Sequence, residues 1–101
     1  MKKYWVLKDK SDHKIYWESL REEAYLKIPE KFEQISFYWK EKEKMDNQEN
    51  NKHFCWAIIQ PDGELWYESA RKTKDLVIQE ISNISIYESL GYKLTEIIFY
   101  N

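Results

Sequence analysis

The chain has 101 residues, of which 43% are apolar and 34% charged, and its formal charge is −2. This length and composition predict a single domain with its own hydrophobic core and exclude a disordered segment. The near-neutral charge excludes a general attraction for nucleic acid and is too small for a polyanion that imitates DNA. One cysteine excludes an internal disulfide, and no apolar run approaches the roughly 18 residues of a membrane span. We therefore expect a cytoplasmic protein without a membrane partner.

The chain begins with a pattern that is typical of a β-hairpin. Aromatic and β-branched residues over 4–8 and 14–18 predict two strands, and the polar stretch 9–13 predicts the turn between them.

Two helices are expected to follow this hairpin. Ser19 and Glu22 have the spacing of a capping box, which predicts a helix that begins at Ser19 and ends before Pro29. A second helix is expected over 30–44, with inward apolar residues at helical spacing, and a polar loop over 46–52.

The second half of the chain shows the same plan. Strands are expected over 54–60 and 65–68, on either side of a turn formed by Pro61 to Glu64. Ser69 is expected to cap the helix that follows.

The chain is expected to end with a short helix and a strand. Ser85 and Glu88 form another capping box, and Gly91 suits the position after the helix. Residues 92–100 are rich in β-branched and aromatic side chains and predict a closing strand.

Residues of the first half recur in the second half at an offset that falls from 51 to 50 and then to 49. The identical pairs are Trp5 and Trp56, Glu18-Ser19 and Glu68-Ser69, Arg21 and Arg71, Ile35-Ser36 and Ile84-Ser85, and Tyr38 and Tyr87. We interpret the chain as two repeat units, 1–45 and 53–101, joined by the polar loop 46–52. The predicted fold is α+β: a duplicated ββα(α) unit with a five-stranded, mostly antiparallel sheet and helices on one face.

One face of this predicted sheet is too apolar to be left in water. It would carry the side chains of Tyr4, Val6, Tyr16, Ala57, Ile59 and Trp66. A second copy of the protein, a partner or a ligand is expected to cover it, and a homo-oligomer is the simplest of these.

The residues give little support to an enzyme. His53 and Cys55 project to the same side of one strand, but two ligands do not make a metal site. The conspicuous serines are expected to serve as helix caps, and with two glycines the chain has no phosphate-binding loop or nucleophile elbow. We expect neither catalysis, nor a cofactor, nor a metal.

Arg21 and Arg71 are candidates for ligand binding because each lies close to aromatic residues, Tyr16 in one unit and Trp66 in the other. A guanidinium beside an aromatic ring can hold an anion that also carries a stacking base, such as a nucleotide. The alternative is that neighbouring glutamates pair with both arginines and leave neither of them available.

Duplex DNA is a second candidate ligand. The segments 56–63 (W-A-I-I-Q-P-D-G) and 69–72 (S-A-R-K) resemble the small arm-binding domains of phage-type integrases, which implies a sheet face that enters a groove. The strands of the second unit lack the basic residues of a DNA reader. The first unit is richer in lysine, at Lys2, Lys3, Lys8, Lys10 and Lys14.

The chain also resembles the small, aromatic-rich accessory proteins that bacteriophages encode against bacterial immunity, including anti-CRISPR proteins and signal sponges. The resemblance lies in its brevity, in the segment 56–63 and in the closing segment 90–98 (L-G-Y-K-L-T-E-I-I). It implies a non-enzymatic inhibitor in the host cytoplasm that sequesters a defence protein or a signalling nucleotide. The alternatives are a DNA-binding regulator and a purely structural interaction module. The residues expected to bind the ligand or partner are Tyr4, Lys14, Tyr16, Arg21, Trp66 and Arg71.

Overall fold

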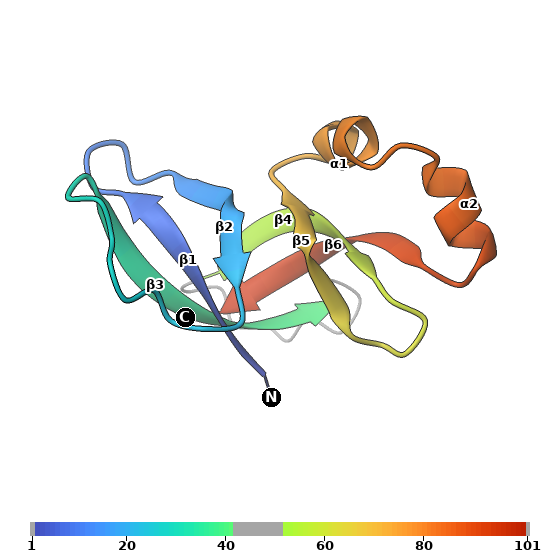
Figure 1. The fold of residues 1–101 in the computed structure, drawn as a ribbon, viewed down its shortest axis with the longest axis horizontal. Coiled ribbons are helices and arrows are strands. Elements are labelled where there is room, and N and C mark those ends of the chain that lie inside the picture. Colours follow the sequence, from blue (N-terminus) through green and yellow to red (C-terminus); the bar gives the residue numbers. More distant parts are fainter. Residues whose placement is uncertain (1, 42–51, 101) are drawn as a thin grey trace.

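The computed structural model describes residues 2–41 and 52–100, which form one antiparallel sheet and two short helices (Figure 1). The elements are β1 (Lys3–Asp9), β2 (Ile15–Arg21), β3 (Phe32–Glu41), β4 (Lys52–Ile59), β5 (Leu65–Arg71), α1 (Lys74–Glu80), α2 (Ile84–Ser89) and β6 (Lys93–Tyr100). The α+β class and the antiparallel sheet are confirmed. The sheet has six strands, in the order β2-β1-β3-β6-β4-β5, and not the five that were expected.

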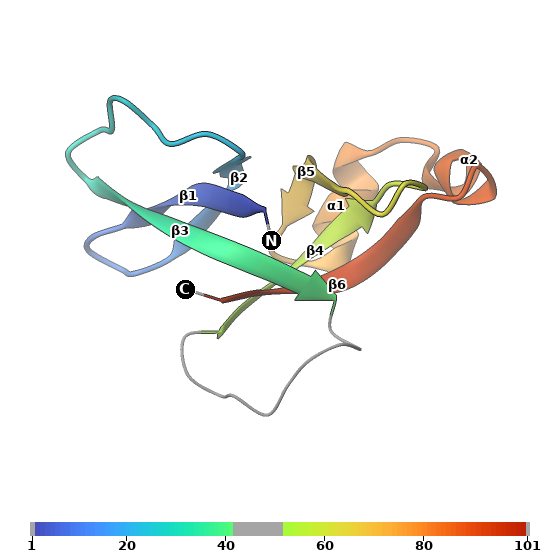
Figure 2. The same cartoon turned by 90° about the horizontal axis from the view of Figure 1, so that it is seen from below.

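The sheet curls into an almost closed barrel. Strands β2 and β5 are its two edges and are not hydrogen-bonded to each other, yet they lie in contact (Figure 2). We call the line along which they meet the β2–β5 seam. The interior is filled by side chains from all six strands, among them Tyr4, Val6, Trp17, Phe37, Cys55, Ala57, Leu65, Ala70, Ile97 and Phe99.

The two helices expected in the first half are wrong. Ser19 lies within β2, and the second expected helix is replaced by β3. Ile35, Phe37 and Trp39 alternate toward the interior, which is the period of a strand, and β3 pairs with β1 from Phe32 to Tyr38. The alternation of β-branched and aromatic residues therefore outweighs the helical spacing in the same segment.

The duplicated ββα plan is not confirmed. The first half consists of three consecutive strands, whereas the second half inserts α1 and α2 between β5 and β6. The linking loop 46–52 falls outside the described residues except at Lys52, where β4 begins. The two hairpins themselves have the same register, with Trp5 opposite Arg21 in one and Trp56 opposite Arg71 in the other.

Ser19 and Ser69 have the same structural role, and it is not helix capping. Each hairpin contains a register irregularity one residue after its tryptophan. There Ser19 Oγ accepts a hydrogen bond from the Leu7 N–H at 2.8 Å, and Ser69 Oγ accepts one from the Ile58 N–H at 2.8 Å. Each hydroxyl also donates to the carbonyl three residues before it, at 2.6 Å. The serines therefore satisfy backbone groups that the irregular pairing would leave buried and unpaired.

The helices lie on the outer face of the second half. Helix α1 begins after Thr73, whose hydroxyl accepts a hydrogen bond from the Leu76 N–H, and it packs on β4, β5 and β6 with Val77 fully buried. Helix α2 ends at Ser89, and Gly91 lies two residues after it with a positive φ of 98°, in the position expected for it. The Tyr92 N–H bonds to the Tyr87 carbonyl there, as in a Schellman motif.

The apolar face that was expected to need a cover is the interior of the barrel. Tyr4 and Val6 are fully buried, while Tyr16 lies on the outside. The expected cross-strand register was wrong by one residue, because Tyr16 pairs with Leu7 and therefore shares its face. The ground for expecting a homo-oligomer is thereby removed.

Tyr4 makes the stability sensitive to alkaline pH. Burial is the main cause that raises the pKa of its phenol to about 12, and the Lys2 ammonium opposes the rise. The pKa of Tyr4 is higher in the folded than in the unfolded protein. The stability that follows from this difference is therefore fully present below about pH 10 and is lost as the pH rises to about 12.

We expect the difference in unfolding free energy between the native protein and Tyr4→Phe to change by on the order of 1 kcal/mol per pH unit within this window. Chemical denaturation at pH 9 and at pH 11 measures it. The same difference at both pH values would contradict the assignment.

Candidate functional site

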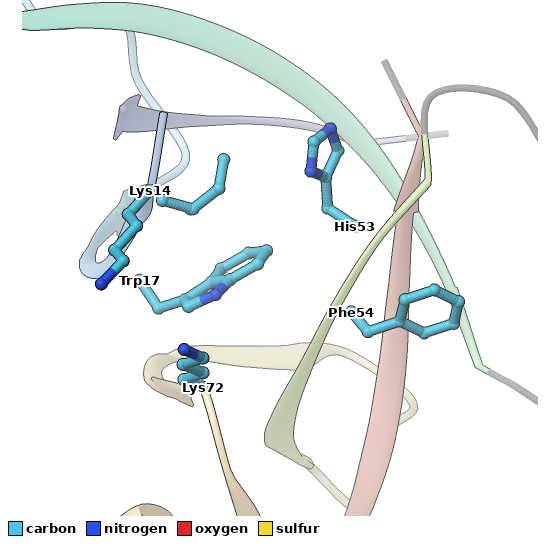
Figure 3. Close-up of a pocket in the computed structure, with 6 residues that line it drawn as sticks. Lys14, Trp17, His53, Phe54 and Lys72 are labelled. Atoms are coloured by element: carbon cyan, nitrogen blue, oxygen red, sulfur yellow. The ribbon is translucent and has the colours of Figure 1, made fainter. Parts of the chain in front are cut away.

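A pocket of about 390 Å³ opens at the end of the barrel where β2 and β4 begin and β5 ends (Figure 3). We call this the basic end. Its lining residues are Lys14, Ile15, Trp17, His53, Phe54 and Lys72. They come from the β1–β2 turn, from β2 and β4, and from the residue after β5. A volume of this size lies within the range of small-molecule sites, about 300 to 1,000 Å³.

The wall of the pocket toward the interior is aromatic. Trp17 is 6% exposed, and its ring centroid lies 5.4 Å from that of Phe99 and 6.1 Å from that of Phe37. His53 lies 5.0 Å from the Phe37 ring. Figure 3 shows the Trp17 and His53 rings bordering one space, whereas the Phe54 ring points away from it. Two planar side chains, held from behind by the core, therefore border the cavity.

Lys14 and Lys72 supply the charge of the basic end. Both are exposed, and neither forms an ion pair with any residue in the described part of the chain. None of the described residues that line the pocket carries a carboxylate. Two ammonium groups that no described carboxylate pairs with, next to aromatic rings, favour an anionic ligand that carries an apolar or planar part.

A second hollow of about 500 Å³ adjoins the first, since Lys14 and Ile15 line both. Tyr16 and Phe32 stack at its surface with ring centroids 6.1 Å apart. Asp9 and Asp12 also line it. The Asp9 carboxylate accepts hydrogen bonds from the Ser11 hydroxyl and N–H, which lower its pKa, so this carboxylate is charged at neutral pH.

The structure brings two of the expected binding residues together. Lys14 lines both hollows, and Tyr16, which is 46% exposed, lines the second. Trp17, His53 and Lys72 were not foreseen as site residues. The recurrence of the hairpin contained a partial signal for Lys72. At an offset of 50 this lysine takes the place of Glu22, so the charge at that position is reversed between the two halves.

The two arginines interact with other residues of their own chain. Arg71 Nη1 donates to the carbonyls of Ala70 and Glu68, at 2.7 and 3.1 Å, and Nη2 lies 4.0 Å from Glu80. Arg21 lies over the Tyr25 ring at 4.5 Å and 3.9 Å from Glu23. Both guanidinium groups are thus engaged within the chain.

Trp66 and Tyr4 also lie away from the basic end. Trp66 packs against Tyr87 and Tyr92, with ring centroids at 5.5 and 6.1 Å, and so holds the α2 region against β5. Tyr4 was expected on an exposed face, but it is fully buried and cannot touch a partner.

The part of the chain that the structure describes contains no candidate metal site. No three His, Cys, Asp or Glu residues lie within reach of one ion there. Cys55 is buried, and burial raises the pKa of its thiol, which keeps the thiol protonated. None of the described helices has the length and apolar character needed to cross a membrane.

Comparison of the chain with protein-family models, with curated proteins and with solved structures gives no match in any of the three. The chemistry of the basic end is therefore the basis for a functional proposal.

Proposed function

We propose that the protein is a non-enzymatic binding protein that sequesters an anionic signal, as a phage-type inhibitor of a bacterial defence system would do. A single observation carries the proposal: Lys14 and Lys72 line a pocket of about 390 Å³ against Trp17, and no carboxylate lines it among the residues that the structure describes. Sequestration needs a shaped, charged cavity, and the pocket at the basic end supports the proposal in this respect.

A nucleotide is the class of signal that suits this chemistry. Its phosphate would contact the ammonium groups of Lys14 and Lys72, and its base would lie against Trp17. Stacking of a base on an aromatic side chain contributes about 1 to 3 kcal/mol, and the core behind the Trp17 ring makes it a rigid partner. The second hollow, with the stacked Tyr16 and Phe32, offers room for a further ring beside Lys14.

Removing either lysine is expected to weaken binding. Isothermal titration calorimetry with a panel of nucleoside monophosphates and cyclic mononucleotides and dinucleotides should find at least one ligand for the native protein. Lys14→Ala and Lys72→Ala should each lower its affinity about 10-fold or more, since a hydrogen bond to a charged group contributes about 1.5 to 3 kcal/mol.

Lys10→Ala is the matched control, because Lys10 is exposed and close in sequence to Lys14 but does not line the pocket. Its affinity should equal that of the native protein. Equal losses in all three lysine variants would point to a diffuse charge effect and contradict the pocket.

Duplex DNA is the second candidate ligand and is titrated alongside the nucleotides. DNA binding would fall steeply with salt and would depend on Lys8 and Lys10 as well as Lys14. Lys8 Nζ lies 3.6 Å from Glu33, and Lys2 lies between two glutamates, so part of the basic character of the first half is neutralised within the chain. Salt-sensitive affinity for duplex DNA together with no affinity for nucleotides would replace the sequestration proposal.

A further inference from the structure

The end of the barrel opposite the basic end is held by an ion cluster. Lys2 Nζ lies 3.0 Å from a Glu22 carboxylate oxygen and 3.3 Å from a Glu64 carboxylate oxygen. Glu22 follows β2, and Glu64 precedes β5, so the two carboxylates lie on opposite sides of the β2–β5 seam. Lys2 therefore joins the two edge strands through charge where no backbone hydrogen bonds join them.

The basic end contains the residues that match this cluster in the other half of the chain. At the offsets of the sequence recurrence, Lys2 corresponds to His53, Glu22 to Lys72 and Glu64 to Lys14. Lys72 follows β5, and Lys14 precedes β2, so they too lie on opposite sides of the seam. Both glutamates of one end are thus replaced by lysines at the other.

Because lysines take the place of both glutamates, the described residues of the basic end form no ion link of the kind that Lys2 makes across the β2–β5 seam. A cation between two anions attracts both sides of the seam, whereas two lysines repel each other. The like charges line one pocket, and none of the described lining residues is an acid that could neutralise them. An anion with several oxygens could contact both ammonium groups at once.

We infer that the basic end binds a phosphate monoester, whose dianionic group contacts Lys14 and Lys72 together and joins β2 to β5 as Lys2 joins Glu22 and Glu64. This rests on the proposed function for the location of the site, and it narrows the ligand to a terminal phosphate. The ester substituent of the phosphate then lies toward Trp17, the planar wall of the pocket. Binding thereby stabilises the seam as well as filling the pocket.

The test is thermal unfolding of the full chain in low salt with inorganic phosphate, with adenosine 5′-monophosphate and with dimethyl phosphate. Sodium chloride at matched ionic strength is the reference. At concentrations well above the dissociation constant, the two dianions should raise the melting temperature by about 4 °C or more. Dimethyl phosphate, a diester with a single charge, should raise it by less than a quarter of that shift.

Lys72→Glu is the decisive variant, because it places at position 72 the same residue type that the matching position 22 carries. The variant should melt above the native protein without phosphate, since the new carboxylate faces Lys14, and it should lose the phosphate shift. Lys72→Gln should lose the shift without a comparable gain in melting temperature. Lys10→Ala should keep the full shift. A Lys72→Glu variant that melts lower than the native protein, or that keeps its phosphate shift, would overturn the inference.

The two proposals fail differently. If nucleotides bind with dependence on Lys14 and Lys72 but dianions give no more shift than chloride, the inference is wrong and the sequestration proposal stands. If inorganic phosphate gives the lysine-dependent shift but no nucleotide of the panel binds, the phosphate site stands and sequestration of a nucleotide is wrong.

Discussion

Replacing Phe99 by alanine is expected to lower the free energy of unfolding by about 3 to 5 kcal/mol, the range for the loss of a fully buried ring. Phe99 lies on β6, near the middle of the sheet order, and is 0% exposed. Its ring centroid lies within 6.3 Å of those of Tyr4, Trp17 and Phe37. The cavity would be bounded by several strands at once and could not collapse without moving them.

Phe54→Ala is the matched control for this substitution. Phe54 lies on the adjacent strand β4 and carries the same side chain, but it is 46% exposed. Its loss should cost less than half as much, because less apolar surface leaves water on folding at this position. Urea denaturation of both variants measures the difference, and equal costs would show that Phe99 is not central to the core.

Ser69→Ala is expected to cost about 1 to 3 kcal/mol of unfolding free energy. The hydroxyl is 1% exposed and is the acceptor for the Ile58 N–H, which alanine would leave buried and unpaired. Ser19→Ala removes the same pair of hydrogen bonds in the first hairpin, where the hydroxyl is 7% exposed, so its cost should be equal or smaller.

Ser89→Ala is the control that separates the cost of an unpaired buried N–H from the cost of removing a serine hydroxyl in general. The Ser89 hydroxyl donates to the carbonyl three residues before it at 2.6 Å, as in Ser19 and Ser69, but it is exposed and accepts no backbone bond among those that the structure describes. Its replacement should stay within about 0.5 kcal/mol of the native protein. Costs for Ser69→Ala and Ser89→Ala that agree within error would contradict the role assigned to the buried serines.

Local sequence features predicted the hairpins and the chain reversals because these depend on short-range chemistry. Gly63 and Gly91 both adopt positive φ, as a turn and a helix end require. The prediction of helices in the first half was wrong because the Ser19–Glu22 spacing is not specific to a capping box. The same spacing also occurs by chance in a strand. The segment around Ile35 and Phe37 fits both periods, and only its pairing with β1 decides between them.

The candidate site was less predictable because it depends on closure of the sheet. Lys14 and Tyr16 are close in sequence and could be proposed together. Lys72 and Lys14 line the same pocket only because the edge strands meet, and no local sequence pattern predicts that meeting of β2 and β5. Arg21 and Arg71 were attractive by type and recurrence, but partners such as Glu23 and Glu80 become visible only in three dimensions.

The meeting of β2 and β5 has a consequence for the behaviour of the protein in concentrated solution. An open sheet edge presents unpaired backbone groups that can recruit a strand from another molecule. In this fold each edge faces the other, so the described sheet has no broad, flat border against which a foreign strand could lie. Aggregation by strand addition therefore requires the curl to open first. The frequency of that opening sets how readily the chains assemble into fibrils.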